Sequence, residues 1–263
     1  MKNFALRNPI LYSILVTIIF FLLMTCSYVI GELLDDISNG KQLGQLIGKI
    51  TISVLLVYII WRFGWLRGSG VGRIGNLKAW LIILIPGIFA ILSTTYAYTG
   101  TIKVPVFMSA ESILISTNML SGGLVEELVF RGLIFYCFLI AWASKKRGLL
   151  KSGLISAIIF GSSHLIWVLL GKDLNLALLQ SLGAFGSGVF YAATVIQTRS
   201  IWPAVIIHGL TNALVYISIS DMPNYYETVN NGITDVLLGI PLIIYGLFVL
   251  MKFSNKATMT YDI

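Results

Sequence analysis

The sequence predicts an all-α fold, a bundle of about eight helices that cross a membrane. Hydrophobic residues make up 57% of the 263 residues, charged residues only 11%, and the mean hydropathy is +0.89. So few polar residues cannot cover the surface of a soluble globule of this size. The apolar runs are roughly 20 residues long, the length that a helix needs to cross a bilayer. We therefore expect a multi-pass protein of the cell membrane.

The expected spans are apolar runs that are bounded by charged or turn-forming residues. They cover residues 10–30, 43–61, 79–98, 124–143, 150–170, 174–196, 201–219 and 233–251. The first run should remain as a helix, because it is long and is followed by many further spans. Cys26 and Cys137 both lie in expected spans, so we expect them to pack as small hydrophobic residues.

The basic residues follow the parity of the loops. With a cytoplasmic amino terminus, that side of the membrane carries Lys2, Arg7, Arg62, Arg67, Arg73, Lys78, Lys145, Lys146, Arg147, Lys151, Arg199, Lys252 and Lys256. The other side carries Glu32, Asp35, Asp36, Lys41, Lys103, Glu111, Lys172, Asp173, Asp221, Glu227 and Asp235. This positive-inside pattern predicts an even number of crossings and two cytoplasmic termini. Because the basic residues form no single patch, nucleic acid is not an expected partner.

The whole chain, residues 1–263, is expected to form a single membrane domain, because no connection between spans is long enough to fold alone. Residues 113–143 break the regular pattern, since this apolar or small stretch is longer than one crossing requires. Two interpretations remain open. Either a half-buried helix turns at Gly122 and Gly123, which puts the following glutamates in the first turn of a helix, or one long helix is strongly tilted.

Ionisable residues within the spans are the main functional signal. Glu126, Glu127 and Arg131 lie in the run LVEELVFRGLIFYCFLIAWA, and the two histidines of the chain, His164 and His208, lie in later spans. Each charge near the centre of a membrane helix costs roughly 2.5 to 3.5 kcal/mol, so such groups persist where they face one another or a watery cavity. The sequence therefore predicts a polar reaction chamber inside the bundle.

Helical spacing separates the roles of the two glutamates. Glu127 and Arg131 are spaced i, i+4 and share a helix face, whereas Glu126 points about 100° away. A buried ion pair that only joins helices would explain Glu127 and Arg131. One arginine cannot neutralise two carboxylates, however, and so Glu126 is expected to serve another purpose.

The two histidines have polar or aromatic neighbours at helical spacing. Phe160 precedes His164 by one turn in FGSSH, and Asn212 follows His208 by one turn in HGLTN. A histidine in a membrane helix can simply form a hydrogen bond between helices. Together with the glutamates, these groups could activate water and stabilise an oxyanion, as hydrolysis of an acyl bond requires. The chain has no GxSxG serine elbow and no HExxH zinc motif.

Three motifs in order resemble those of a known family. EELVFR, FGSSH and HGLTN match the EExxxR, FxxxH and HxxxN motifs of the CPBP family, which comprises CAAX prenyl endopeptidases and bacteriocin-processing, Abi-type membrane proteases. The resemblance covers residues 122–219. It implies that Glu126 activates water with help from His164, that His208 and Asn212 steady the oxyanion, and that Glu127 and Arg131 orient the site.

Cofactor and substrate are less constrained. Glu127, His164 and His208 could supply three ligands of an open zinc site, but no two of them share the i, i+4 spacing of the zincin helix, so a metal-free mechanism is favoured. The expected substrate is a membrane-associated peptide or protein. Two other functions remain open: a non-catalytic scaffold or bacteriocin-immunity protein, and an ion-coupled transporter.

Overall fold

The computed structural model describes residues 2–100, 110–142, 144–220 and 227–255. In these ranges every regular element is helical and no strand occurs, so the all-α prediction is confirmed. The elements are α1 (Lys2–Arg7), α2 (Pro9–Leu33), α3 (Gly40–Arg62), α4 (Leu77–Thr99), α5 (Ala110–Glu127), the π-helix η1 (Leu128–Phe135), α6 (Tyr136–Trp142), α7 (Gly148–Ser163), α8 (Ile166–Leu169), α9 (Leu174–Thr198), α10 (Trp202–Ser220) and α11 (Val229–Asn255). Lys103, Ala143, Asp221 and Lys256, which the predictions above use, lie outside the described residues.

Seven of these segments are long and apolar enough to cross a membrane: α2, α3, α4, α7 together with α8, α9, α10 and α11. The remaining expected span, residues 124–143, lies in the segment formed by α5, η1 and α6. This segment is helical, but it contains Glu126, Glu127 and Arg131, which distinguish it from a purely apolar span. The prediction of about eight crossings is therefore close.

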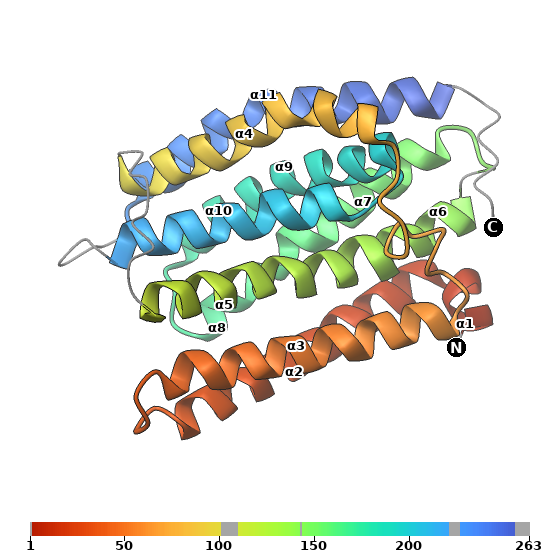
Figure 1. Cartoon of the computed structure of the whole chain (residues 1–263). Coiled ribbons are helices and arrows are strands. Elements are labelled where there is room, and N and C mark those ends of the chain that lie inside the picture. The colour runs from red at the N-terminus through yellow and green to blue at the C-terminus, as the bar shows by residue number, and fades with distance from the viewer. Residues whose placement is uncertain (1, 101–109, 143, 221–226, 256–263) are drawn as a thin grey trace.

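Successive spans run in alternate directions through the bundle (Figure 1). As a result, α1 and the last turns of α11 lie at the same end of the bundle, as an even number of crossings requires. The assignment of this end to the cytoplasm stays a prediction from the distribution of charge.

The segment from Ala110 to Trp142 is one continuous helix, in which η1 joins α5 to α6. The interpretation in which a new helix begins at Gly122 and Gly123 is therefore wrong. Glu126 and Glu127 occupy the last turn of α5 and lead directly into η1, so they are not at the positive end of a helix dipole. The two glycines serve packing rather than chain reversal.

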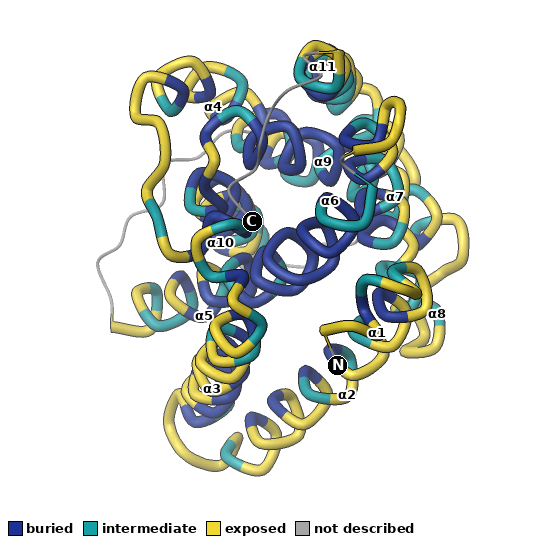
Figure 2. The backbone as a smooth tube through the Cα atoms, turned by 90° about the vertical axis from the view of Figure 1, so that its right-hand side faces the viewer, coloured by how far each residue is buried: buried dark blue, intermediate teal, exposed yellow. Residues whose placement is uncertain are grey.

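This long helix forms the centre of the molecule (Figure 2). All eight residues of η1 are buried, and α2, α3, α7 and α9 all contact η1. The pair α2 and α3 packs on one side, while α10 packs between α5 and α4, and α9 packs between α7 and α11. The outer faces of α2 and α4 expose large apolar side chains, including Ile18, Leu22, Leu81 and Ile85, as expected for helices that face lipid.

Glycines allow the helices that carry the motifs to approach closely. A Cβ atom on Gly123 of α5 would lie 2.6 Å from the backbone nitrogen of Gly209 in α10, so the two backbones are in direct contact. Between α7 and α9, a Cβ atom on Gly161 would lie 2.7 Å from the carbonyl oxygen of Ser181. Small residues are typical of such helix contacts in membranes. The contact between Gly123 and Gly209 places the two glutamates of α5 beside His208.

We expect Gly123→Ala to lower the melting temperature of the detergent-solubilised protein, because the added methyl group would meet backbone atoms that cannot rotate away. Overpacking of this kind costs about 1–3 kcal/mol. Gly239→Ala in α11 is the matched control, since a Cβ atom there meets nothing within 4 Å. Equal melting temperatures for the two variants would contradict the close packing of α5 against α10.

Candidate active site

Glu127 lies at the centre of the site and joins two helices. Its Oε1 atom accepts a hydrogen bond from Nη1 of Arg131 at 3.0 Å and lies 2.9 Å from Nδ1 of His208 in α10. Both Glu127 and Arg131 are fully buried. Because a carboxylate only accepts hydrogen bonds, Nδ1 of His208 carries the proton in this contact.

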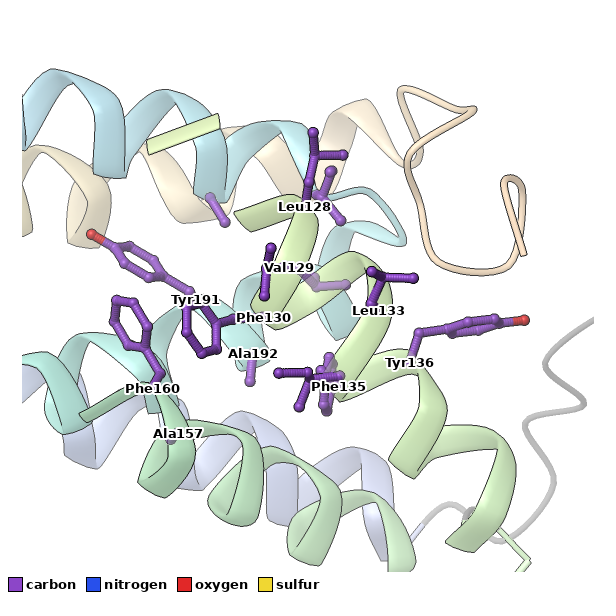
Figure 3. Packing of buried hydrophobic residues seen from close by; sticks show 14 of the residues in the cluster. Leu128, Val129, Phe130, Leu133, Phe135, Tyr136, Ala157, Phe160, Tyr191 and Ala192 are labelled. Carbon is purple, nitrogen blue, oxygen red and sulfur yellow. The ribbon is translucent and has the colours of Figure 1, made fainter. Parts of the chain in front are cut away.

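Arg131 is held by contacts from three directions. Besides its bond to Glu127, Nη2 donates to the carbonyl oxygen of Gly188 in α9 at 3.3 Å. The guanidinium carbon lies 4.5 Å from the ring centre of Phe160 and 5.2 Å from that of Tyr191. Figure 3 shows these two rings projecting from α7 and α9 into the same region of the core. The arginine is therefore fixed by one carboxylate, one carbonyl group and two aromatic faces.

The π-helix η1 begins directly after Glu127 and contains Arg131. A π-helix closes i→i+5 hydrogen bonds and is rare in proteins, where it occurs mostly as short insertions that are frequently at functional sites. Here the altered winding coincides with the buried pair of Glu127 and Arg131. The sequence carried no local signal for this change of winding.

Glu126 has a different environment from Glu127. Its side chain keeps 24% of its surface exposed, and its Oε2 atom lies 3.7 Å from Nε2 of His208. This distance is too long for a direct hydrogen bond, and a gap of this size between polar atoms is one that a water molecule can bridge. His208 therefore lies between the two glutamates, with one ring nitrogen towards each.

His164 lies at a short interruption inside the span formed by α7 and α8. The expected helix over residues 150–170 is interrupted, because α7 ends at Ser163 and α8 begins at Ile166. Nδ1 of His164 lies 3.0 Å from the carbonyl oxygen of Phe160, so Nδ1 carries a proton and Nε2 of the neutral ring keeps its lone pair. The Phe160 ring contacts both imidazoles, at 5.1 Å from His164 and 5.9 Å from His208.

A cavity of about 430 Å³ lies beside these groups. Its lining includes Phe160, His164, His208 and Asn212; Glu126 is not a lining residue, but it lies 3.7 Å from His208. The far part of the cavity is lined by polar residues of other helices and connections, among them Lys172, Gln180, Glu227 and Asp235. The structure thus places His164, His208 and Asn212 in the wall of one cavity, while Glu126 and Glu127 contact His208 but are not among the lining residues.

Tyr191 is a site residue that the sequence motifs did not indicate. Its ring stacks on the His208 ring, with centroids 5.2 Å apart and planes inclined by 18°, and it also contacts Arg131. In the sequence it is one aromatic residue in the apolar stretch GVFYAATV, so nothing distinguished it from a core residue.

The proposed zinc ligands do not form a metal site in this arrangement. Among the described residues, no three histidine, cysteine, aspartate or glutamate side chains lie close enough to hold one metal ion. Oε1 of Glu127 already contacts both Arg131 and His208. The donor set of Glu127, His164 and His208 therefore does not fit a three-ligand zinc centre.

Comparison with known proteins supports the motif analysis. Residues 109–214 match the family model described as type II CAAX prenyl endopeptidase Rce1-like. The resemblance to the CAAX prenyl endopeptidase family is confirmed. The protein named "Putative membrane peptidase YdiL" from Bacillus subtilis (strain 168) is 29% identical over 141 residues, which are 54% of this chain and 49% of that relative.

The chain thus spans about half the length of that curated relative. No solved structure gave a significant match. The family match and the apolar helices together identify a multi-pass membrane protein. The matched region contains all three motifs, because it runs from the start of α5 to beyond Asn212 in α10.

We expect Glu127→Gln to destabilise the protein strongly, because it leaves the buried Arg131 without its counter-charge. Removing one partner of a buried ion pair typically costs about 3–5 kcal/mol. The variant should accumulate poorly in membranes and melt at a lower temperature in detergent. Glu111→Gln, at an exposed position of the same helix, is the control that should leave both measurements unchanged.

Proposed function

We propose that the protein is an intramembrane endopeptidase that activates water with a glutamate, and that residues 122–219 form its catalytic core. The main supporting observation is that His208 lies between Glu126 and Glu127 and lines a cavity together with His164 and Asn212. The family match and the relative named as a membrane peptidase support the same class of reaction.

In this proposal Glu126 is the general base. It is the glutamate without an arginine partner, it is partly exposed, and its Oε2 atom is not directly hydrogen-bonded to His208. A carboxylate at that place can take a proton from water as the water attacks a peptide carbonyl. His164, whose Nε2 lone pair is available in the neutral ring, assists from the wall of the same cavity.

Stabilisation of the oxyanion is assigned to Asn212 and His208. Asn212 can donate a hydrogen bond through its amide group whatever the charge of its neighbours. His208 uses its Nδ1 proton towards Glu127, so its Nε2 atom can donate only when the ring is doubly protonated. In that form the carboxylate of Glu127 balances the charge of the ring, and Arg131 holds this carboxylate in place.

The substrate class follows from the place of the site. The cavity lies among helices that cross the membrane, so we assign as substrate a peptide bond that a membrane-associated peptide or protein presents within or next to the bilayer. Removal of water from the surroundings of the site would strengthen the electrostatic interactions of the reacting groups.

We expect Glu126→Gln to reduce peptide cleavage by about 10²–10⁴-fold, the usual contribution of a general base, while the protein still inserts into membranes. The measurement compares the peptides in membranes that carry wild-type protein, Glu126→Gln or the control Glu111→Gln. Products that disappear only with Glu126→Gln would reveal the substrate and its cleavage site. Unchanged products in all three samples would exclude Glu126 as the base.

Treatment with a strong chelator should leave the activity of the purified protein unchanged, because no described set of three ligands surrounds a metal position. Metal content and cleavage are measured on the same sample before and after chelation. Stoichiometric zinc whose removal abolishes cleavage, and whose return restores it, would contradict the metal-free mechanism.

A further inference from the structure

Lys49 is a buried lysine in the middle of the span α3, and it has no ion-pair partner among the described residues. Only 3% of its surface is exposed. Its ammonium group donates to both oxygens of Asn118 in α5, at 2.7 Å to Oδ1 and 3.1 Å to the backbone carbonyl. Neutral oxygens thus solvate a positive charge that a membrane span would otherwise disfavour.

A small hydrogen-bond network fixes the position of this ammonium group. The amide nitrogen of Asn118 donates to Oε1 of Gln45 at 3.1 Å and to Oε1 of Gln42 at 2.5 Å. Because the two glutamines bind the nitrogen, the oxygen of the Asn118 amide is directed towards Lys49. The network joins α3 to α5 and holds the lysine in one place.

The ammonium group of Lys49 lies beside Gly122 of α5, which precedes Glu126 by one helical turn. Asn118, Gly122 and Glu126 follow one another at intervals of four residues, so they share one face of α5. A Cβ atom on Gly122 would lie 3.8 Å from Nζ of Lys49, so the lysine tip lies against this face. Gly122, which lies between Asn118 and Glu126 on this face, contributes no side chain. Glu126 is also the charged group that acts electrostatically on Lys49.

Lys49 supplies a second buried cation near the two adjacent carboxylates. Two carboxylates, Glu126 and Glu127, face two cations, Arg131 and Lys49, and Arg131 is bonded to Glu127. We propose that Lys49 is a positioning residue whose ammonium group is the counter-charge of Glu126. It keeps this carboxylate ionised inside the membrane, as the base of the proposed hydrolysis must be; that last step rests on the function proposed above.

Other ionisable groups also act on Glu126 and belong to the same balance. They are Tyr28 of α2, Glu127 and Arg131 of the central helix, His164 after α7, Tyr191 of α9, and His208 of α10. Lys49 differs from Arg131, the other cation, because it is not bonded to a carboxylate.

The test follows the protonation of Glu126 by infrared titration of the purified full-length protein, so it needs no substrate. The carboxyl band of Glu126 is identified by its loss in Glu126→Gln. In Lys49→Met this band should appear at a higher pH than in the wild type, because the neighbouring positive charge has gone. Lys49→Arg, which keeps the charge, should restore the wild-type titration. Once a peptide substrate is known, the pH at which the cleavage rate falls on acidification should also be higher in Lys49→Met than in the wild type.

Gln45→Leu is the matched structural control. It removes one hydrogen bond of the same network but no charge, so it should leave the titration of Glu126 unchanged. If the Glu126 band of Lys49→Met titrates at the same pH as in the wild type, the proposal is wrong. An equally large shift of this band in Gln45→Leu would also overturn it. Because the infrared titration does not measure hydrolysis, its result stands whether or not the chain is a protease.

If Lys49→Met does not accumulate, the double variant Lys49→Met/Glu126→Gln tests whether Lys49 acts through its charge or only through its hydrogen bonds. Removal of both charges restores neutrality, so the double variant should accumulate and melt at a higher temperature than Lys49→Met alone. A double variant as unstable as Lys49→Met would show that the lysine acts only through its hydrogen bonds, and the proposal would fail.

Discussion

The buried pair of Glu127 and Arg131 is the interaction on which the rest of the site depends. Both groups are fully removed from solvent, and burying a charged pair is costly unless further contacts stabilise it. Their partners come from three further helices: His208 from α10, Gly188 and Tyr191 from α9, and Phe160 from α7. The ion pair thereby fixes the relative positions of the helices that carry the three motifs.

The two adjacent glutamates are separated by their surroundings rather than by their chemistry. Glu127 is buried, and its Oε1 atom contacts two hydrogen-bond donors, on Arg131 and His208. Glu126 is partly exposed and has only a long contact with His208. One step along a helix is enough to produce this difference, because adjacent residues point in different directions. The division lets one carboxylate hold the structure while the other remains available for a reaction.

Much of this arrangement could be predicted from the sequence. The spacing of Glu127 and Arg131 indicates a pair on one helix face, and three motifs in order indicate the family. Contacts between distant segments left no such signal: Tyr191 and Lys49 reach the site through packing of α9 and α3, which helical periodicity alone cannot locate.

The glycines before the glutamates misled one prediction for a physical reason. Glycine is a common chain breaker, but in a membrane helix it also permits close approach of a neighbour. Gly123 faces Gly209, and Gly122 leaves room beside Lys49, so neither one ends the helix. The winding of η1 and the interruption after Ser163 likewise arise from tertiary packing, which the local sequence does not record.

The polar rim of the cavity has a consequence for the direction of access. Lys172 and Glu227 form an ion pair at 2.8 Å, are each about a fifth exposed, and lie where α9 and α11 begin. That end of the bundle is opposite to α1 (Figure 1). If both termini lie in the cytoplasm, as the charge pattern predicts, this end of the bundle lies on the opposite side of the membrane. In the function proposed above, residues at this end of the cavity would then meet substrates from outside the cytoplasm.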